Sequence, residues 1–184
     1  MPATHTGKLT YADYARIPDD GLRHEIIDGG HYVSPSPSER HQRASGALFS
    51  LLWHHVRTHR LGRVYAAPFD VLLGAHDVVE PDIIFVSNTR ADIVGEDNIQ
   101  GAPDLLIEVL SPSHRKRDQT VKRARYDALG VTEYWLVDPD AEQISVLRRD
   151  AGGLTAAGVY GSDASVTSPL LPGLTITVAD VFAP

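Results

Sequence analysis

The sequence predicts an α/β fold in which helices flank a mixed β-sheet. Residues 39–60 carry apolar side chains at helical spacing, and a second helical segment, 114–129, ends at Gly130. Between them lie three apolar, strand-like runs with short connections, which favour an antiparallel meander. The runs are residues 63–73, 80–87 and 104–110. Another apolar strand, 133–139, follows the second helix, and a strand–helix–strand passage favours parallel pairing through a right-handed crossover.

The N-terminal part is expected to add a short helix and a β-hairpin. Thr10 is a favourable N-cap for a helix that Pro18 stops. Residues 23–34 hold two strand-like runs around the Asp-Gly-Gly segment at 28–30, which supplies the positive φ that tight hairpin turns need. The hairpin therefore precedes the central sheet.

Residues 39–60 are the longest expected helix. Ser38, the last serine of a Pro/Ser loop, is a good N-cap, and Gly62 ends the helical pattern. The stripe expected to face the core consists of Ala44, Leu48, Leu51, Leu52 and Val56.

The second helix is expected to bury Val121, Ala124 and Ala128. At 100° per residue this stripe has Lys122 at its border, and Asp118 lies one turn earlier, where the two can pair. Lys122 can then reach inward, whereas Lys116, Arg117 and Arg123 point more outward. Further strands are expected in residues 143–149, 154–160 and 174–178.

Composition excludes several kinds of site. The 184 residues suffice for one domain, 1–184, with a sizeable core. Because the chain has no cysteine, disulfides, thiolate metal sites and a cysteine nucleophile are excluded. No apolar run approaches the length of a membrane span, and the N-terminus lacks an apolar signal segment. A cytoplasmic protein without membrane contact is expected.

The charge is unevenly distributed. A net charge of −7 argues against a generic nucleic-acid-binding protein, which usually has a basic surface. Residues 114–125, however, contain six Lys or Arg against one acid, Asp118. Such a run is ordinarily a solvated helix face. Next to catalytic acids it could instead contact a phosphate backbone.

A carboxylate interrupts the apolar run 104–110. Side chains alternate along a strand, so Glu108 shares one face with Leu106 and Leu110. A lone buried carboxylate would raise its pKa and become neutral, unless a cation keeps it charged. Asp82 opens the neighbouring apolar run, and the two acids can meet if these strands are adjacent. Two carboxylates plus water oxygens suit Mg²⁺ or Mn²⁺.

A metal-dependent nuclease also needs a positive donor near the acids. Leu110 stands two residues after Glu108, where a lysine would complete an acid-x-Lys pair. Lys122 on the following helix offers a replacement.

Eight motifs in one order resemble the Uma-type restriction endonuclease family, within the PD-(D/E)XK nuclease superfamily. The resemblance covers nearly the whole chain, from about residue 9 to residue 182. The motifs are RHEIIDG, SPSPSERHQ, APFDV, EPDIIFV, GAPDLLIEVLSPS, the spaced set Asp118, Lys122, Tyr126 and Gly130, EYWLVDP, and LPGL. The resemblance implies a restriction-endonuclease-like core, a three-stranded meander plus a crossover strand.

The resemblance also implies an activity, Mg²⁺-dependent hydrolysis of phosphodiester bonds. On this basis Asp82 and Glu108 are the catalytic, metal-binding acids, and Lys122 takes the role of the missing lysine. Glu25 matches an extra acid near the metal, although a solvent-facing strand residue is the plainer interpretation. A homodimer is also consistent with the family.

Other candidate residues rank lower. Asp70 interrupts a strand as Glu108 does, and a structural hydrogen bond explains it equally well. His41 falls on the inward face of the long helix, where it could approach a phosphate or simply pack in the core. Asp118 could pair with Lys122. Arg115, Arg117 and Arg123 are the candidates for contacts with a nucleic-acid backbone.

Two classes of function remain open. The first is an endonuclease that uses Mg²⁺ or Mn²⁺ on a nucleic acid, with DNA as the expected substrate. The second is a non-catalytic nucleic-acid-binding or dimerisation module that keeps the nuclease fold. The net charge of −7 and the leucine at position 110 favour this alternative.

Overall fold

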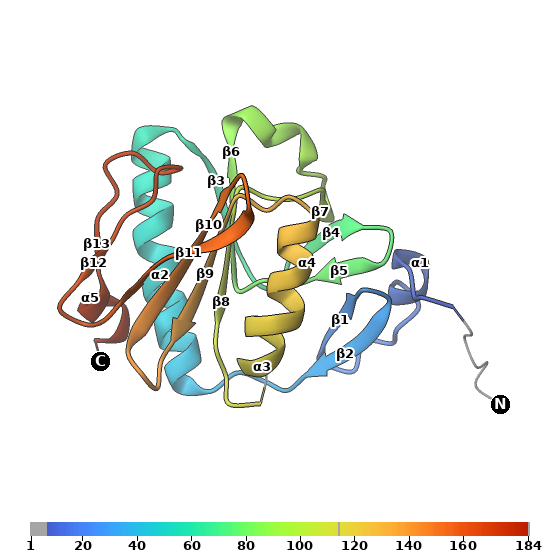
Figure 1. Ribbon diagram of the computed structural model, residues 1–184. Coiled ribbons are helices and arrows are strands. Elements are labelled where there is room, and N and C mark those ends of the chain that lie inside the picture. The colour runs from blue at the N-terminus through green and yellow to red at the C-terminus, as the bar shows by residue number, and fades with distance from the viewer. Residues whose placement is uncertain (1–6, 114, 184) are drawn as a thin grey trace.

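A computed structural model describes residues 7–113 and 115–183 and confirms the α/β class, with sheets flanked by helices (Figure 1). Its N-terminal half contains α1 (Tyr11–Tyr14), β1 (Arg23–Ile27), β2 (Gly30–Ser34), α2 (Glu39–His59), β3 (Gly62–Ala66), β4 (Asp70–Gly74), β5 (Asp77–Val79), β6 (Ile83–Ser87), η1 (Asn88–Ile93) and β7 (Asn98–Gln100). The C-terminal half contains β8 (Leu105–Val109), α3 (Arg115–Arg117), η2 (Asp118–Lys122), α4 (Arg123–Ala128), β9 (Glu133–Asp138), β10 (Gln143–Asp150), β11 (Gly153–Tyr160), β12 (Ser165–Val166), β13 (Ile176–Thr177) and α5 (Val178–Phe182).

The main sheet has six strands in the order β11-β10-β9-β8-β6-β3. Strands β3, β6 and β8 pair antiparallel, which confirms the three-stranded meander. Strand β9 then pairs parallel with β8 after the helical segment α3–η2–α4, which confirms the crossover. These connections place β8 in the middle of the sheet, covered on both faces.

Alternation along the strands divides the core into two layers. On β8, Leu105, Ile107 and Val109 pack in the layer that includes α2 and α5. Leu106 and Leu110 pack in the opposite layer, with α4 and the second sheet. Glu108 lies between Leu106 and Leu110 in the alternation, so it points into this second layer.

The predicted strand 63–73 is two strands in different sheets. β3 ends at Ala66 and β4 starts at Asp70, with Pro68 between them. Proline has no N–H to donate and does not continue a ladder. β4 enters a second, five-stranded sheet of order β2-β1-β5-β4-β7. The predicted hairpin 23–34 is present in this sheet, with positive φ at Asp28 and Gly29.

Helix α2 agrees with its predicted cap but not with every buried position. The Ser38 hydroxyl accepts a hydrogen bond from the His41 N–H, and the helix ends at Arg60 in the left-handed conformation rather than at Gly62. His41, Ala44, Leu48, Leu52 and Val56 are buried, whereas Leu51 is 37% exposed. The inclusion of Leu51 in the core stripe was therefore wrong. Within the described residues, no helix is both long and apolar enough to cross a membrane.

The predicted stripe of the second helix was also wrong. Its buried residues are Asp118, Lys122 and Tyr126, at i, i+4 and i+8, while Ala124 and Ala128 are exposed. The segment η2 has π-helical hydrogen bonding, which changes the angular phase of the helix. The helix therefore turns a polar face inward, and this face needs buried partners of opposite charge.

Two leucines test which face of α2 is buried, since Leu48 is buried and Leu51 is partly exposed. We expect Leu48→Ala to lower the free energy of unfolding by about 2–5 kcal/mol, because its side chain is fully buried. The matched variant Leu51→Ala should change it by less than about 1 kcal/mol. Denaturant unfolding monitored by circular dichroism measures both, and equal losses would contradict the observed orientation of the helix.

Candidate active site

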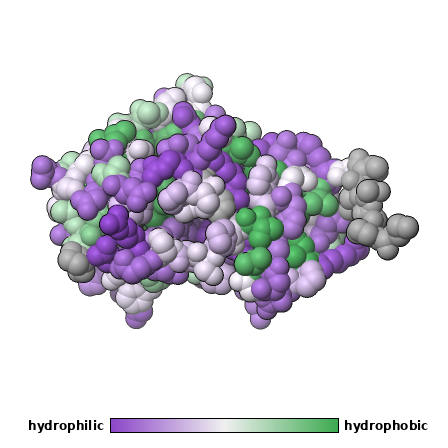
Figure 2. Space-filling view, turned by 90° about the horizontal axis from the view of Figure 1, so that it is seen from below, coloured by the Kyte–Doolittle hydropathy of each residue, from purple (hydrophilic) through white to green (hydrophobic). Residues whose placement is uncertain are grey.

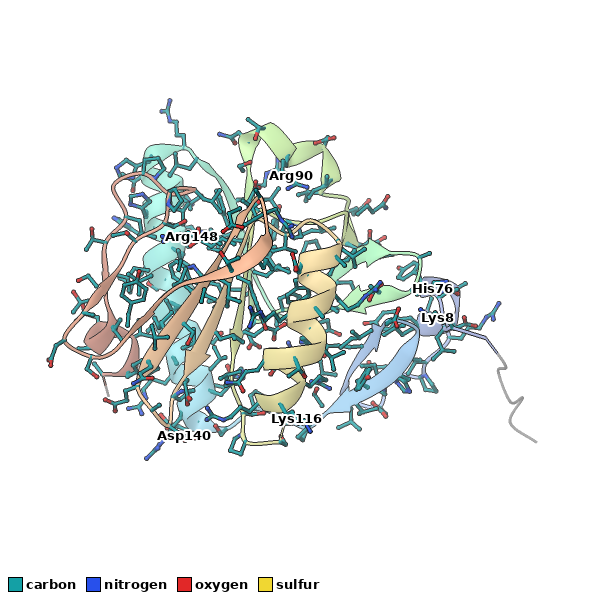
Figure 3. The ribbon with its side chains drawn as sticks, viewed as in Figure 1. Lys8, His76, Arg90, Lys116, Asp140 and Arg148 are labelled. Carbon is teal, nitrogen blue, oxygen red and sulfur yellow. The ribbon has the colours of Figure 1, made fainter. Side chains whose placement is uncertain are left out.

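A cavity of about 320 Å³ is lined in part by Arg117 of α3, the short helix at the lower end of the ribbon in Figure 1, where Figure 3 labels Lys116. It is lined by the Pro/Ser segment that precedes α2, by the loop after β8 and by charged side chains from both sheets; we call it the carboxylate cavity. The charged lining residues are Arg23, His41, Asp82, Glu108, Arg117, Asp118 and Lys122. Figure 2 views this end and shows a mostly hydrophilic surface with paler residues near its middle.

The ammonium group of Lys122 joins the two sheets at this cavity. Its Nζ lies 2.7 Å from Glu108 Oε1 on β8 and 2.7 Å from Glu25 Oε1 on β1. Asp118 Oδ1, one helical turn earlier, is 3.8 Å away. Glu25, Glu108 and Lys122 are all at most 2% exposed, so the solvent-facing interpretation of Glu25 was wrong.

Burial and charge act in opposite directions on these groups. Burial lowers the pKa of Lys122, but Glu108 and Glu25 outweigh it and raise that pKa. Burial raises the pKa of Glu25, but Lys122 and Arg23 lower it below its ordinary value. In contrast, burial raises the pKa of Glu108 to about 8, because the attraction of Lys122 is offset by Asp118, Asp82 and Glu25.

The two carboxyl oxygens of Glu108 differ in their hydrogen bonds. Oε1 accepts from Lys122 Nζ and, at 2.8 Å, from the Tyr126 hydroxyl. Oε2 faces Arg23 Nη2 at 3.8 Å, beyond hydrogen-bonding distance. Oε2 is therefore the oxygen that carries a proton when the carboxyl group is neutral, and the oxygen open to another cation.

Asp82 lies next to Glu108 across the β6–β8 pair. Ile83 pairs with Ile107, so the register brings Asp82 opposite Glu108. Asp82 Oδ2 accepts a hydrogen bond from the Val109 N–H at 2.7 Å and lies 3.2 Å from His41 Nε2. Burial would raise its pKa, but His41, the nearby guanidinium and the Val109 N–H together hold it well below the ordinary value.

Arg23 is a site residue that sequence reasoning missed. Its Nη1 donates to Asp82 Oδ1 at 2.9 Å, its Nη2 lies near Glu108, and the guanidinium also contacts the Glu80 carbonyl. The available signal was position: Arg23 precedes Glu25 by two residues on one strand, so both side chains share a face.

Arg117 points into the carboxylate cavity, contrary to the outward direction expected. Its Nη2 lies 3.4 Å from Glu25 Oε2 and donates to Ser34 Oγ at 3.0 Å. Its guanidinium also lies over the Tyr32 ring, 5.4 Å from the centroid. The inward turn follows from the buried negative charge of Glu25.

Three other candidates lie outside this cavity. Arg115 forms a double ion pair with Asp138, and Arg123 Nη2 lies 3.4 Å from the Leu154 carbonyl oxygen. Asp70 accepts a 2.8 Å hydrogen bond from the Tyr14 hydroxyl, in line with the structural interpretation. The structure thus brings together Glu25, His41, Asp82, Glu108, Arg117, Asp118 and Lys122, and leaves Asp70, Arg115 and Arg123 elsewhere.

Buried polar atoms without a hydrogen bond gather at this cavity. Within the described part of the chain there are six such side-chain atoms, and five belong to the cluster. The five are Arg23 Nε, Glu25 Oε2, His41 Nδ1, Arg117 Nε and Asp118 Oδ1. Because buried polar groups are nearly always satisfied, this concentration indicates that water, an ion or a substrate completes the site.

The oxygen donors suit a hard divalent cation, with one condition. Mg²⁺ is commonly held by one or two carboxylates together with water and substrate oxygens. Asp82 Oδ1 and Glu108 Oε2 both face Arg23, and in residues 7–113 and 115–183 no three His, Asp or Glu side chains form a ready ligand set. The acids therefore fit Mg²⁺ or Mn²⁺, provided that the guanidinium moves aside.

Comparisons with solved structures, with curated proteins and with family models gave the following results. In a crystal structure described as a "putative nuclease belonging to DUF820", from Anabaena variabilis ATCC 29413, the chain superposes with a TM-score of 0.79 at 24% identity, covering 95% of this chain and 98% of that one. The type IIG restriction endonuclease BpuSI gives a TM-score of 0.38 at 16% identity, over 81% of this chain and 16% of the enzyme. A comparison with curated proteins gave no match.

The model of the Uma2 family, described as "Putative restriction endonuclease", matches residues 11–179. Since the match spans both sheets and every charged residue of the carboxylate cavity, the chain belongs to the Uma2 family.

Proposed function

We propose that this protein is a divalent-metal-dependent nuclease that hydrolyses phosphodiester bonds in DNA. The observation that carries the proposal is the buried cluster of Asp82, Glu108 and Glu25 around Lys122, where five buried polar atoms lack a hydrogen bond. Membership of the Uma2 family supports the same reaction.

The acids would hold the metal. Asp82 and Glu108 are the ligands, and Glu25 assists directly or through water. A bound Mg²⁺ or Mn²⁺ lowers the pKa of a bound water and neutralises phosphoryl charge. Arg23 would have to move from between the acids, and its guanidinium could then pair with a phosphate oxygen.

The basic side chains would act on the phosphodiester itself. Lys122 holds its proton and supplies a fixed positive charge beside the attacking water or the phosphoryl oxygens. Arg117 neutralises a neighbouring phosphate oxygen. His41 Nδ1 is buried without a hydrogen bond, and because Nε2 faces the Asp82 carboxylate, Nδ1 of the neutral ring would accept a hydrogen bond from water. In the reaction, water oxygen bonds to phosphorus and releases a proton, the ester P–O bond breaks, and the leaving oxygen takes a proton from solvent water.

Glu108→Gln tests the proposal directly. We expect this variant to lose at least about 100-fold in Mn²⁺-dependent DNA cleavage, because it removes a ligand charge while keeping the side chain's shape. Asp70→Asn is the matched control, a carboxylate outside the cavity whose loss should leave cleavage nearly unchanged. Gel assays on single-stranded DNA, duplex DNA and RNA, with circular dichroism as a check on folding, provide the measurement.

Two results would contradict this proposal. One is equal cleavage by wild type and Glu108→Gln. The other is steeply salt-dependent DNA binding with no cleavage and no effect of metal on the melting temperature, which would favour the non-catalytic module. The position of Arg23 between the acids is the observation that favours that second candidate.

The raised pKa of Glu108 predicts how metal binding depends on pH. With a pKa near 8 instead of its ordinary value of 4.5, the carboxyl group is protonated at pH 7, and a metal must displace that proton. Mn²⁺ affinity should therefore rise by up to about tenfold per pH unit below pH 8 and level off above it. In metal-free protein, the raised pKa of Glu108 adds to the free energy of unfolding at low pH, and this contribution is lost as the pH rises through about 8. Calorimetric titrations in two buffers measure the released proton, and Glu108→Gln should release none.

Lys122→Met tests the charge balance. Removal of the ammonium leaves Glu25 and Glu108 buried without their main partner, and we expect a loss of about 3–5 kcal/mol in the free energy of unfolding. Lys116→Met, on the exposed side of the same helical segment, should change it by less than about 0.5 kcal/mol. Denaturant unfolding compares the two, and similar small effects would show that Lys122 does not balance the cluster.

A further inference from the structure

We infer that a second cavity, directly beside the catalytic acids, receives one unstacked nucleobase of the substrate next to the phosphate that is cleaved. This side cavity has a volume of about 510 Å³ and shares Arg23, His41 and Asp82 with the carboxylate cavity. The inference rests on the proposed function, from which it takes a nucleic acid as the substrate. Its lining includes Asp19, Leu22, Gln42, Ser45, Gly46, Phe49, Pro68 and Glu80.

One wall of the side cavity is a face of α2. Gln42, Ser45, Gly46 and Phe49 follow each other at i, i+3, i+4 and i+7, the spacing that puts side chains on one side of a helix. The two central residues are small, and the flanking residues are larger. The helix surface is therefore hollow in the middle of the cavity.

No steric contact requires a glycine at position 46. A Cβ atom built on it meets nothing within 4 Å, and its φ is not in the left-handed region. Glycine in a helix interior is less favourable than alanine, because it loses more chain entropy on folding. A residue that weakens its helix and touches nothing is explained if the space above it holds a ligand.

Apolar groups form the rest of the wall. Leu22 is 47% exposed, and Phe49, Ala67 and Pro68 also line the space. Leu22 is held in place because Asp20 Oδ1 accepts its backbone N–H at 2.9 Å. Such surfaces suit a flat ring, which gains from contact with apolar and aromatic side chains on its faces.

The charges assign base and phosphate to different cavities. Asp19 and Glu80 line only the side cavity and would repel a phosphate, whereas Lys122 and Arg117 line only the carboxylate cavity. Arg23, His41 and Asp82 line both. The carboxylates and the Gln42 amide can instead accept hydrogen bonds from exocyclic amino groups. Adenine, cytosine and guanine carry such groups, and thymine and uracil do not.

The free-energy cost of unstacking a base determines whether single-stranded or paired DNA is the better substrate. Moving a base out of a duplex costs a few kcal/mol, and least when the base is unpaired or already single-stranded. The side cavity therefore predicts a preference for single-stranded DNA or for an unpaired position over fully paired duplex.

Filling the cavity tests the inference. Gly46→Leu should raise the melting temperature of the free protein by about 2–4 °C, because leucine is the better helix former. The same variant should bind a short single-stranded oligonucleotide at least tenfold more weakly, since the leucine occupies the space of the base. Ser50→Leu adds the same side chain at an exposed position of α2 outside the cavity and should bind as wild type does.

A thermodynamic cycle identifies the base as the occupant. Fluorescence anisotropy, with Ca²⁺ in place of Mg²⁺, measures the binding of oligonucleotides in which one position at a time is abasic. At one position, removal of the base should weaken binding to the wild-type protein by the same factor as Gly46→Leu weakens binding of the intact oligonucleotide. The two changes together should weaken binding no further than either one alone. Thymine at that position should bind more weakly than adenine or cytosine.

The outcomes separate this inference from the proposed function. The inferred base cavity would be wrong if Gly46→Leu weakened the binding of intact and abasic oligonucleotides equally, or if it weakened neither. This holds whether or not the protein cleaves DNA. If wild type fails to cleave while the cycle shows coupling, the nuclease proposal fails and the base cavity stands.

Discussion

The buried ammonium group of Lys122 is the contact on which the site and much of the fold depend. It bonds Glu25 of the second sheet and Glu108 of the main sheet at 2.7 Å each, and it comes from the helix between β8 and β9. Three charges taken out of water cost several kcal/mol each unless they satisfy one another. The two sheets and the helix must therefore meet in one arrangement, because any slip of register would leave a charge buried alone. This requirement also explains why the helix turns a polar face, rather than its alanines, toward the core.

The cluster is nevertheless not neutral. Four carboxyl groups, Glu25, Asp82, Glu108 and Asp118, face three permanent cations, Arg23, Arg117 and Lys122. One acid must then hold a proton or find another cation, and the bonding of Glu108, with Oε2 left open, marks it as that acid. An excess of one negative charge at a cavity whose polar atoms lack partners favours a divalent ion. The same excess would be a liability in a purely structural cluster, where a fourth cation or one fewer acid would be more stable.

Sequence reasoning succeeded where the evidence was local and failed where it depended on distant pairing. The shared face of Leu106, Glu108 and Leu110 follows from strand alternation, and the meander and crossover follow from the order of elements. Arg23 was missed because β1 reaches the site only by joining β5, fifty residues later, in a sheet that no local pattern revealed. Lys122 was expected to reach inward, but from the border of an apolar stripe that does not exist. The π-helical turn at 118–122 changed the phase, and buried acids selected which face turned in.

The two cavities together show how a chain of net charge −7 can address a polyanion. At the carboxylate cavity, acids hold the cationic groups of Lys122 and Arg117 in place, and a divalent ion would offset the remaining negative charge where a phosphate would lie. The side cavity carries carboxylates and apolar groups, which would disfavour a phosphate and suit the proposed base. His41, Asp82 and Arg23 stand at the boundary between the two. In the proposed complex, a nucleotide that entered in the reverse sense would place its phosphate against Glu80 and Asp19, so these two acids would favour one direction of binding. Charged residues inside the two cavities can orient a nucleotide without a basic surface elsewhere on the protein. The net negative charge of the rest of the molecule would then limit nonspecific binding along a nucleic acid.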